Sequence, residues 1–460
     1  MQAPFDIAAD LDTPVSAYLK LAGLKPRFLL ESVEGGERLA RYSFLGFGDA
    51  VEVRMDAGGI SIDGEPRARP TDQHEYLDAL RGALSRAPRP MPADDLPFAG
   101  GLVGVSGYDV VRLFEKLPQN TTPQTGVPDA AFVAPSSLLV FDHLTRRVAL
   151  LHDGPEAERQ GLRAEVIAKL RGPVPERATK ASIGPAEATM SEAEYSARVE
   201  ACKEYIAAGD IYQIVLSVLF RGKTNVPPFE VYRAMRLLNP SPYMFYFDFD
   251  DLQVVGSSPE ALVRLHGRTA SLRPIAGTLP RGDTRQEDLA NETALLADPK
   301  EAAEHVMLVD LARNDLGRVA SAGSVHVDPY RSIERYSHVM HIVSGVQGEL
   351  ADGYDQFDLF AASFPAGTLV GAPKVRAMQI IEEMEQAGRG LYAGTAGYFG
   401  LSGDMDQAIT IRTLVFSGDE YSFQAGAGIV ADSVPAREYQ EVLAKSAILR
   451  RALEMAGEGL

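Results

Sequence analysis

The sequence predicts an α+β fold, in which strands and helices are mixed within one chain. Short apolar or alternating runs, typical of strands, are interspersed with runs that have the wider apolar spacing of helices. The two kinds of run do not alternate strictly, which argues against a doubly wound parallel sheet. With 460 residues, 45% of them hydrophobic, the chain can bury a core without disulfides or metal ions.

The first part of the chain, to about residue 170, has patterns typical of mixed strands and short helices. Its apolar runs are short and are broken by glycine and aspartate, which punctuate strands and turns. Strands or hairpins are expected at 28–33, 41–47, 50–55, 59–64 and 136–154, and helices at 74–87 and in the second half of 98–115. Residues 172–190 are rich in Pro, Gly, Ala and charge, and we expect a linker there. The expected regions are therefore 1–190, the N-terminal region, and 191–460, a second domain.

The second region has stronger patterns. Ser191 with Glu194 three residues later forms a capping-box signature before a helix at 191–210. Further helices are expected at 227–239, 298–319, 357–364, 372–386 and 435–456, the last with Ser433 as its cap. Strands are expected at 211–220, 243–249, 252–258, 261–267, 391–400, 408–417 and 421–431, and a rigid loop at 273–282.

Composition and charge exclude several classes of protein. The formal net charge is −18, which disfavours binding to nucleic acid and to anionic membranes. Cys202 is the single cysteine, so internal disulfides and thiolate metal clusters are excluded. The N-terminus has no signal-peptide pattern, and no apolar run approaches the length of a membrane span. We expect a cytoplasmic protein.

Pattern alone leaves several candidate functional residues ambiguous. Glu304 heads an apolar helical stripe with Leu308 and Leu311, so it is either a metal ligand or general acid, or a rim carboxylate paired with a cation. Glu441 and Lys445 have the i, i+4 spacing of an ordinary surface ion pair.

The roles of the glycines and of the reactive side chains are equally ambiguous. The Gly426–Ala427–Gly428 run fits either a close ligand contact or a crowded turn. His341 matters only if it faces the same cavity as the carboxylates, and Cys202, inside a helix without a nearby histidine, is expected to be structural. The segment 363–374 lacks the Lys-Ser/Thr ending of a phosphate-binding loop.

Read together, the motifs resemble the chorismate-utilising enzymes, and within that family the component I subunits that form anthranilate. The similar segments cover nearly the whole chain and are densest from 195 to 450. They include LLES, GDIYQIVLS, NPSPYMFY, SSPEALVRL, RPIAGTLPRG, AEHVMLVDLARNDLGRV, FPAGTLVGAPKVRAMQIIEE and QAGAGIVADSVPAREYQEVLAK. The resemblance implies a large β-sheet sandwich flanked by helices, with the active site in the C-terminal part.

The resemblance also implies the roles of particular residues. Glu304 and Glu441 match the carboxylates that hold Mg²⁺, an ion that prefers oxygen ligands. His341 matches the acid–base residue that helps a group to leave the ring. The substrate chorismate is expected to contact Gly277, Thr278, Tyr392, Arg412, Gly426, Ala427, Gly428 and Lys445.

Two positions separate reactions within the family. Gln213 replaces the lysine base of the water-using members, which favours ammonia as the nucleophile. Ala276 replaces the nucleophilic lysine of many aminodeoxychorismate synthases. The expected reaction is therefore chorismate plus ammonia to anthranilate and pyruvate, in tryptophan biosynthesis. The chain departs from the family pattern at Leu279, Val370, Val218 and Leu219.

The resemblance further implies two partners. Ser32, Pro242, Tyr243 and Met244 match a feedback pocket for tryptophan. No glutaminase motif fits the chain, so a separate glutamine amidotransferase subunit, component II, is expected to supply ammonia. Two alternatives stay open: an aminodeoxychorismate synthase component I of the alanine-containing type, and a non-catalytic tryptophan-sensing subunit.

Overall fold

The computed structural model describes residues 5–32, 41–92, 96–175, 181–335 and 339–460. Within them, one continuous antiparallel sheet dominates the molecule. Its strands pair in the order β10 (Gln213–Lys223), β24 (Glu420–Ile429), β23 (Thr413–Ser417), β12 (Leu252–Ser258), β11 (Tyr243–Asp248), β2 (Pro26–Glu31), β3 (Tyr42–Asp56), β7 (Ala130–Asp142), β6 (Gly101–Ser106), β21 (Thr395–Gly400), β22 (Met405–Ile409), β13 (Ala261–His266), β14 (Thr269–Leu272), β19 (Val346–Glu349) and β16 (His326–Val327).

Shorter strands complete the β structure. Those that join the large sheet are β1 (Ile7–Ala8), β4 (Gly59–Ile62), β5 (Glu65–Arg67), β8 (Arg147–His152), β9 (Glu187–Ala188) and β20 (Gly371–Ala372). A separate three-stranded sheet contains β15 (Ile275–Pro280), β18 (Val339–Val343) and β17 (Ser332–Arg335).

The large sheet curls so that its two halves face each other. Phe28, Phe245 and Val254 from one half pack in a single buried cluster with Val103 and Val133 from the other half. The second, larger cluster lies between the sheet and the helices. This arrangement confirms the expected α+β fold with a sheet sandwich flanked by helices.

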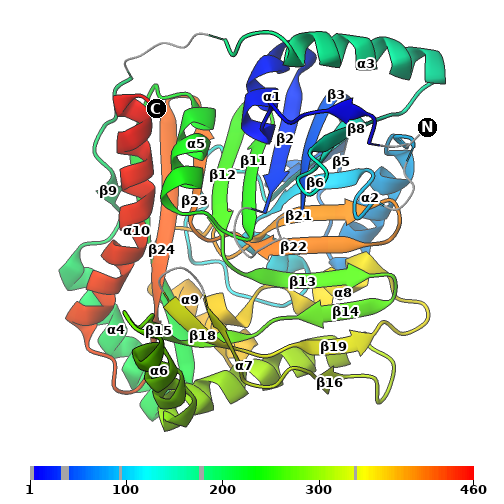
Figure 1. The fold of residues 1–460 in the computed structure, drawn as a ribbon. Helices are drawn as coiled ribbons and strands as arrows, with labels where there is room; N and C mark the ends of the chain where they lie inside the picture. Colours follow the sequence, from blue (N-terminus) through cyan, green and yellow to red (C-terminus); the bar gives the residue numbers. More distant parts are fainter. Residues whose placement is uncertain (1–4, 33–40, 93–95, 176–180, 336–338) are drawn as a thin grey trace.

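Ten α-helices lie within the described residues, and they cover the outer faces and one end of the sheet (Figure 1). They are α1 (Pro14–Lys20), α2 (Gln73–Arg86), α3 (Glu156–Leu170), α4 (Glu192–Ala207), α5 (Pro228–Leu238), α6 (Arg285–Ala297), α7 (Pro299–Gly317), α8 (Gln356–Ser363), α9 (Lys374–Met384) and α10 (Pro435–Glu458). In Figure 1 the long α10, in red, runs beside β24, and α7 and α6 lie beneath β15 and β18.

Most predicted helices form where the sequence placed them. The Ser191–Glu194 capping box is present at the start of α4, and Asp298 caps α7 by accepting hydrogen bonds from the backbone of Lys300 and Glu301. The expected cap of α10 is wrong: the Ser433 hydroxyl accepts instead from the backbone N–H of Val430 at 3.1 Å.

Two other expectations also fail. The expected loop at 273–282 contains strand β15, because its backbone pairs with β18. The helix expected late in 98–115 is a 3₁₀ turn at Tyr108–Leu113.

The two expected regions share the large sheet. β2 of the N-terminal region pairs with β11, and β6 pairs with β21. The division at residue 190 itself stays a prediction, and residues 176–180 of the expected linker lie outside the described residues. None of the helices that the structure describes combines the length and the apolar character needed to cross a membrane.

Candidate active site

A cavity of about 650 Å³ lies between the end of the large sheet and the small sheet. Its walls are formed by β10 and β24, by β15 and by the facing sides of α7 and α10. A volume of this order suits a small organic ligand. Ten of the twelve catalytic, substrate and metal residues expected from the sequence line it: Gln213, Gly277, Thr278, Glu304, Tyr392, Arg412, Gly426, Gly428, Glu441 and Lys445.

The sheet wall of the cavity requires small residues. A Cβ at Gly426 would lie 2.6 Å from the carbonyl oxygen of Leu216 and 2.8 Å from the hydroxyl of Tyr392. A Cβ at Gly428 would lie 2.9 Å from the side-chain nitrogen of Gln213. Glycine at these positions therefore lets Tyr392 and Gln213 approach the strand backbone. Ala427, between the two glycines, is buried and is not among the described residues that line the cavity.

Gly277 and Thr278 present a second stretch of backbone to the cavity. Gly277 has φ of +77°, which favours glycine, and the pairing register between β15 and β18 shifts at this point. The Oγ1 atom of Thr278 lies 2.9 Å from Nδ1 of His341, its partner on β18. His341 therefore reaches the cavity through Thr278; it is not itself among the described lining residues.

The hydrogen bonds of His341 indicate its protonation state. Its Nδ1 atom also lies 3.2 Å from the carbonyl oxygen of Gly277. Because a carbonyl oxygen only accepts, this contact assigns the proton to Nδ1 and makes Nε2 the basic nitrogen. Burial lowers the pKa of His341, and the nearby Arg412 guanidinium lowers it further, which favours a neutral imidazole.

Arg412 supplies a cation to the same cavity. Its backbone has φ of +49°, an uncommon conformation for a residue with a side chain. Its guanidinium donates to the side-chain oxygen of Asn239 at 3.4 Å. A guanidinium at this position suits a carboxylate of a ligand.

Carboxylates gather where α7 faces α10. Glu301 and Glu304 from α7 and Glu438 and Glu441 from α10 line this end of the cavity. The pKa of Glu304 is raised by burial and by the neighbouring carboxylates of Glu301 and Glu441, although Lys300 opposes the rise. The same causes, burial and the carboxylate of Glu441, raise the pKa of Glu438.

Lys445 partly balances this charge. Its Nζ atom lies 2.7 Å from Oε1 of Glu441 and donates to the carbonyl oxygen of Gly426 at 3.1 Å. Among the described residues, no group of three or more His, Cys, Asp or Glu side chains could hold a metal ion alone. Oxygen donors from two helices nevertheless fit Mg²⁺, because this ion usually keeps several water or substrate ligands.

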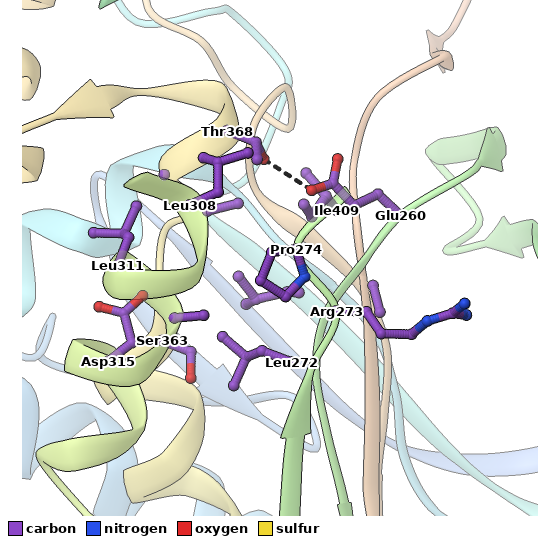
Figure 2. A pocket seen from close by; sticks show the side chains of 15 residues that line it. Glu260, Leu272, Arg273, Pro274, Leu308, Leu311, Asp315, Ser363, Thr368 and Ile409 are labelled. Carbon is purple, nitrogen blue, oxygen red and sulfur yellow. Dashed lines mark hydrogen bonds between the residues drawn. The ribbon is translucent and has the colours of Figure 1, made fainter. Parts of the chain in front are cut away.

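The structure adds a cavity residue that the sequence analysis missed. Glu260, directly before β13, lines the same cavity, and its Oε1 atom accepts from the hydroxyl of Thr368 at 3.0 Å (Figure 2). Burial raises the pKa of this carboxyl group to about 7. The signal was present in the sequence as a glutamate after Ser-Ser-Pro at the end of an apolar strand, but that pattern alone does not reveal burial.

A second cavity, of about 600 Å³, lies between β2, β11 and β21. All four residues of the expected feedback pocket line it: Ser32, Pro242, Tyr243 and Met244. The Tyr243 hydroxyl donates to Asp406 at 3.0 Å and accepts from Arg264 at 2.7 Å, so polar groups close one side. The other side is apolar, with Leu30 and Phe44.

Comparison with known proteins identifies the family. The family model for the chorismate binding enzyme matches residues 25–451. The chain belongs to the chorismate-binding enzyme family. It is 47% identical to anthranilate synthase component 1 of Thermus thermophilus, with 98% of this chain and 97% of the relative covered. The corresponding protein of Cereibacter sphaeroides is 45% identical, with coverage of 98% and 94%.

A solved structure gives the same result. The crystal structure of anthranilate synthase component I from Streptococcus pneumoniae has a TM-score of 0.82 and 35% identity, and covers 98% of this chain and 100% of that one. The resemblance to this branch of the chorismate-binding family is therefore confirmed.

The departures from the family pattern do not reach the cavity of this chorismate-binding enzyme. Val218, Leu219 and Val370 are buried, and neither they nor Leu279 are among the described lining residues. Cys202 is also buried, and burial raises the pKa of its thiol to about 12. A thiol of that kind is a poor nucleophile, in agreement with the structural role expected for it.

Proposed function

We propose that the chain converts chorismate and ammonia to anthranilate and pyruvate. The observation that carries this proposal is similarity over almost the full length to anthranilate synthase component 1 proteins. The cavity supports it, because Gln213 and Ala276 line it in place of the lysines that would favour water as nucleophile or a covalent adduct.

The cavity suits a cyclic dicarboxylate. Arg412 offers a guanidinium for one carboxylate, and the backbones of Gly277, Gly426 and Gly428 approach the ligand closely. In our proposal Tyr392 and Thr278 contact the ring side, and Ala427 contributes only backbone. Lys445 lies at the carboxylate end, where it offsets part of the negative charge.

We propose Mg²⁺ as the cofactor, held by Glu304 and Glu441. When bound, the ion supplies the positive charge that a substrate carboxylate needs at this acidic end of the cavity. Glu301 lies close enough to raise the pKa of Glu304, and Glu441 raises the pKa of Glu438. Without a cation, these carboxylates would repel a dianionic substrate.

Two proton transfers follow from the proposed chemistry. Ammonia adds to the ring and the hydroxyl group leaves as water, so an acid must donate a proton; Glu260 is suited because its pKa is about 7 and it lines the cavity. Loss of pyruvate from the amino intermediate requires removal of a ring proton. Neutral His341 is suited to accept it, and Gln213 would orient the ammonia.

We also propose the expected partners. A glutamine amidotransferase subunit would deliver ammonia, because free ammonia at neutral pH is mostly present as the ammonium ion, which is not nucleophilic. The single thiol of the chain is buried and unsuited to glutamine hydrolysis. Tryptophan would bind the second cavity as a feedback inhibitor, and the expected cytoplasmic location stays a prediction.

A product assay tests the proposal. The protein is incubated with chorismate, MgCl₂ and an ammonium salt, and the products are identified by fluorescence and mass. Anthranilate and pyruvate in equal amounts support the proposal. Accumulation of 4-amino-4-deoxychorismate would instead support the folate-pathway alternative, and tryptophan binding without turnover would support a sensing subunit.

A further inference from the structure

A chamber of about 50 Å³ adjoins the main cavity. The two spaces share Glu260, Leu308 and Thr368, so they meet at the proposed acid. Figure 2 shows α7 on one side of the chamber and the segments around Glu260 and Pro274 on the other. Arg273 and Leu311 line the chamber and are partly exposed, so it lies near the molecular surface.

A second buried carboxylate, Asp315, lines this chamber. Its side chain is only 5% exposed, and Oδ2 accepts from Nζ of Lys374 at 2.9 Å. Its Oδ1 atom is buried and has no hydrogen-bond partner among the described residues. In Figure 2, Asp315 and Ser363 lie toward one end of the chamber, and Glu260 and Thr368 toward the other.

Water is the occupant that fits this lining. A buried carboxylate oxygen without a donor is costly, and a water molecule is the smallest donor available. The volume corresponds to about three to five water molecules, at roughly 10–15 Å³ each. The hydroxyls of Ser363 and Thr368 add polar partners, whereas Leu272, Leu311 and Ala312 keep the remaining wall apolar.

The proposed reaction needs a second route to Glu260. A ligand that fills the main cavity separates this carboxyl group from the solvent on that side. If chorismate binds while Glu260 is ionised, the complex is unproductive until a proton arrives by another path. Among the described residues, the charged groups that line the chamber are Glu260, Asp315 with its partner Lys374, and Arg273, which pairs with Glu334. The Arg318 guanidinium also acts on Asp315 from the end of the same helix.

We propose that water in this chamber carries protons between Asp315 and Glu260 while the main cavity is occupied. In each turnover a C–N bond forms and a C–O bond breaks. The hydroxyl leaves as water with the proton of Glu260, and the added nitrogen releases one proton to solvent. Glu260 regains one proton from Asp315 through the chamber water, and Asp315 regains one from solvent at the surface end of the chamber beside Arg273 and Leu311, so protons balance. This inference rests on the proposed function.

Two variants interrupt the path in different ways. Ala312→Leu adds bulk to the chamber wall and leaves both residues of the Asp315–Lys374 ion pair in place, and Ala312→Ser is its matched control because it leaves room for water. Asp315→Asn removes the relay carboxylate, and Asp310→Asn, at an exposed carboxylate of the same helix, is its control. Ala312→Leu decides the outcome if Asp315→Asn does not fold.

The experiment measures steady-state and single-turnover anthranilate formation at about pH 8, where much of Glu260 is ionised. We expect Ala312→Leu and Asp315→Asn to lower kcat about tenfold or more, with KM for chorismate within about twofold. Their single turnovers should become biphasic, because the ionised fraction must first release chorismate. Both controls should react in one phase.

The result that would overturn the inference is a single phase in Ala312→Leu, with or without a lower kcat. A merely structural defect would slow all molecules equally and would not create two phases. Failure of the proposed function looks different, because the unsubstituted protein would then form no anthranilate at all.

Discussion

Arg389 and Glu385 form a buried ion pair directly behind the wall of the main cavity. The two side chains are 1% and 3% exposed, and the guanidinium donates to both carboxylate oxygens at 2.7 and 2.9 Å. Arg389 also donates to the backbone oxygens of Val215 and Leu369, and its guanidinium lies 5.6 Å from the ring centre of Tyr392. One ion pair therefore anchors three parts of the cavity wall.

The first prediction concerns this pair. Arg389→Met leaves Glu385 as an uncompensated buried charge, and we expect a loss of about 3–5 kcal/mol in the free energy of unfolding. Urea denaturation at neutral pH measures it. Arg313→Met, at an exposed arginine whose guanidinium faces Asp310, is the control and should change the stability by less than about 1 kcal/mol. Equal stability of the two variants would contradict the anchoring role.

The second prediction concerns the acidic end of the cavity. Glu304→Ala should lower Mg²⁺-dependent turnover by about 100-fold or more, because a direct oxygen ligand is lost. The fold should remain intact, since the carboxylate repels its neighbours Glu301 and Glu441 and its removal relieves that repulsion. Titration with MgCl₂, followed by anthranilate fluorescence and by thermal unfolding, measures both effects. Asp310→Ala on the same helix serves as control.

Chelation provides the complementary measurement. Removing divalent cations from the unsubstituted protein with EDTA should abolish turnover, and added MgCl₂ should restore it. The Glu304→Ala variant should recover little activity at any Mg²⁺ concentration. Full recovery of this variant at the MgCl₂ concentration that restores the unsubstituted protein would remove Glu304 from the metal site.

Local patterns in the sequence were sufficient to predict most helices. The Ser191–Glu194 pair and the long apolar stripe of α7 depend only on residues within one or two turns, so they could be read without the fold. Strand β15 could not, because its strand character depends on pairing with β18, some 60 residues later. Ser433 illustrates the same limit, since its hydroxyl bonds back to Val430 rather than into α10.

The residues of the candidate site also divide into those that the sequence indicated and those that only the fold reveals. Glu304, Glu441 and Arg412 were singled out by resemblance, and the fold brings them to one cavity. Glu260 was missed because nothing in its neighbourhood of the sequence shows that its carboxyl group is buried. The same is true of Asp315, whose significance depends on a chamber formed by five separate segments.

The third prediction concerns the pH dependence of the proposed acid. Because Glu260 must be protonated to act and its pKa is about 7, kcat should fall as the pH rises through about 7. The assay is run at constant free ammonia, so that the ionisation of ammonium does not mask the effect. Glu260→Gln should lose at least about 100-fold in kcat and should lack this titration. If kcat of Glu260→Gln still falls as the pH rises through about 7, the titration belongs to another group.

The Glu260→Gln variant should lose activity but gain thermal stability. The folded pKa of Glu260 is raised above the unfolded value of about 4.3, so its contribution is fully present at low pH and is lost as the pH rises through about 7. Glutamine cannot ionise. Glu260→Gln should therefore gain in thermal stability relative to the unsubstituted protein between about pH 5 and pH 8. A constant difference across that range would contradict the raised pKa.

The fourth prediction concerns His341. His341→Ala should permit amination but impair loss of pyruvate, since the proposed acceptor of the ring proton is absent. An amino intermediate should accumulate, detectable by mass, while chorismate is still consumed. Thr278→Val keeps the histidine but removes its 2.9 Å hydrogen bond, and a smaller accumulation is expected. Complete loss of chorismate consumption in both variants would place His341 in the first step instead.

The last prediction concerns the second cavity. Ser32 lines it with Met244 and Pro242, and no described residue lines both this cavity and the main one. A large side chain there should exclude an indole-sized ligand, so Ser32→Arg should raise the tryptophan concentration for half-inhibition about tenfold or more. Turnover without tryptophan should change less than about twofold. Inhibition curves at fixed chorismate measure the shift, with Ser61→Arg, on the short strand β4, as the control. An unchanged curve in Ser32→Arg would show that tryptophan, if it inhibits, binds elsewhere.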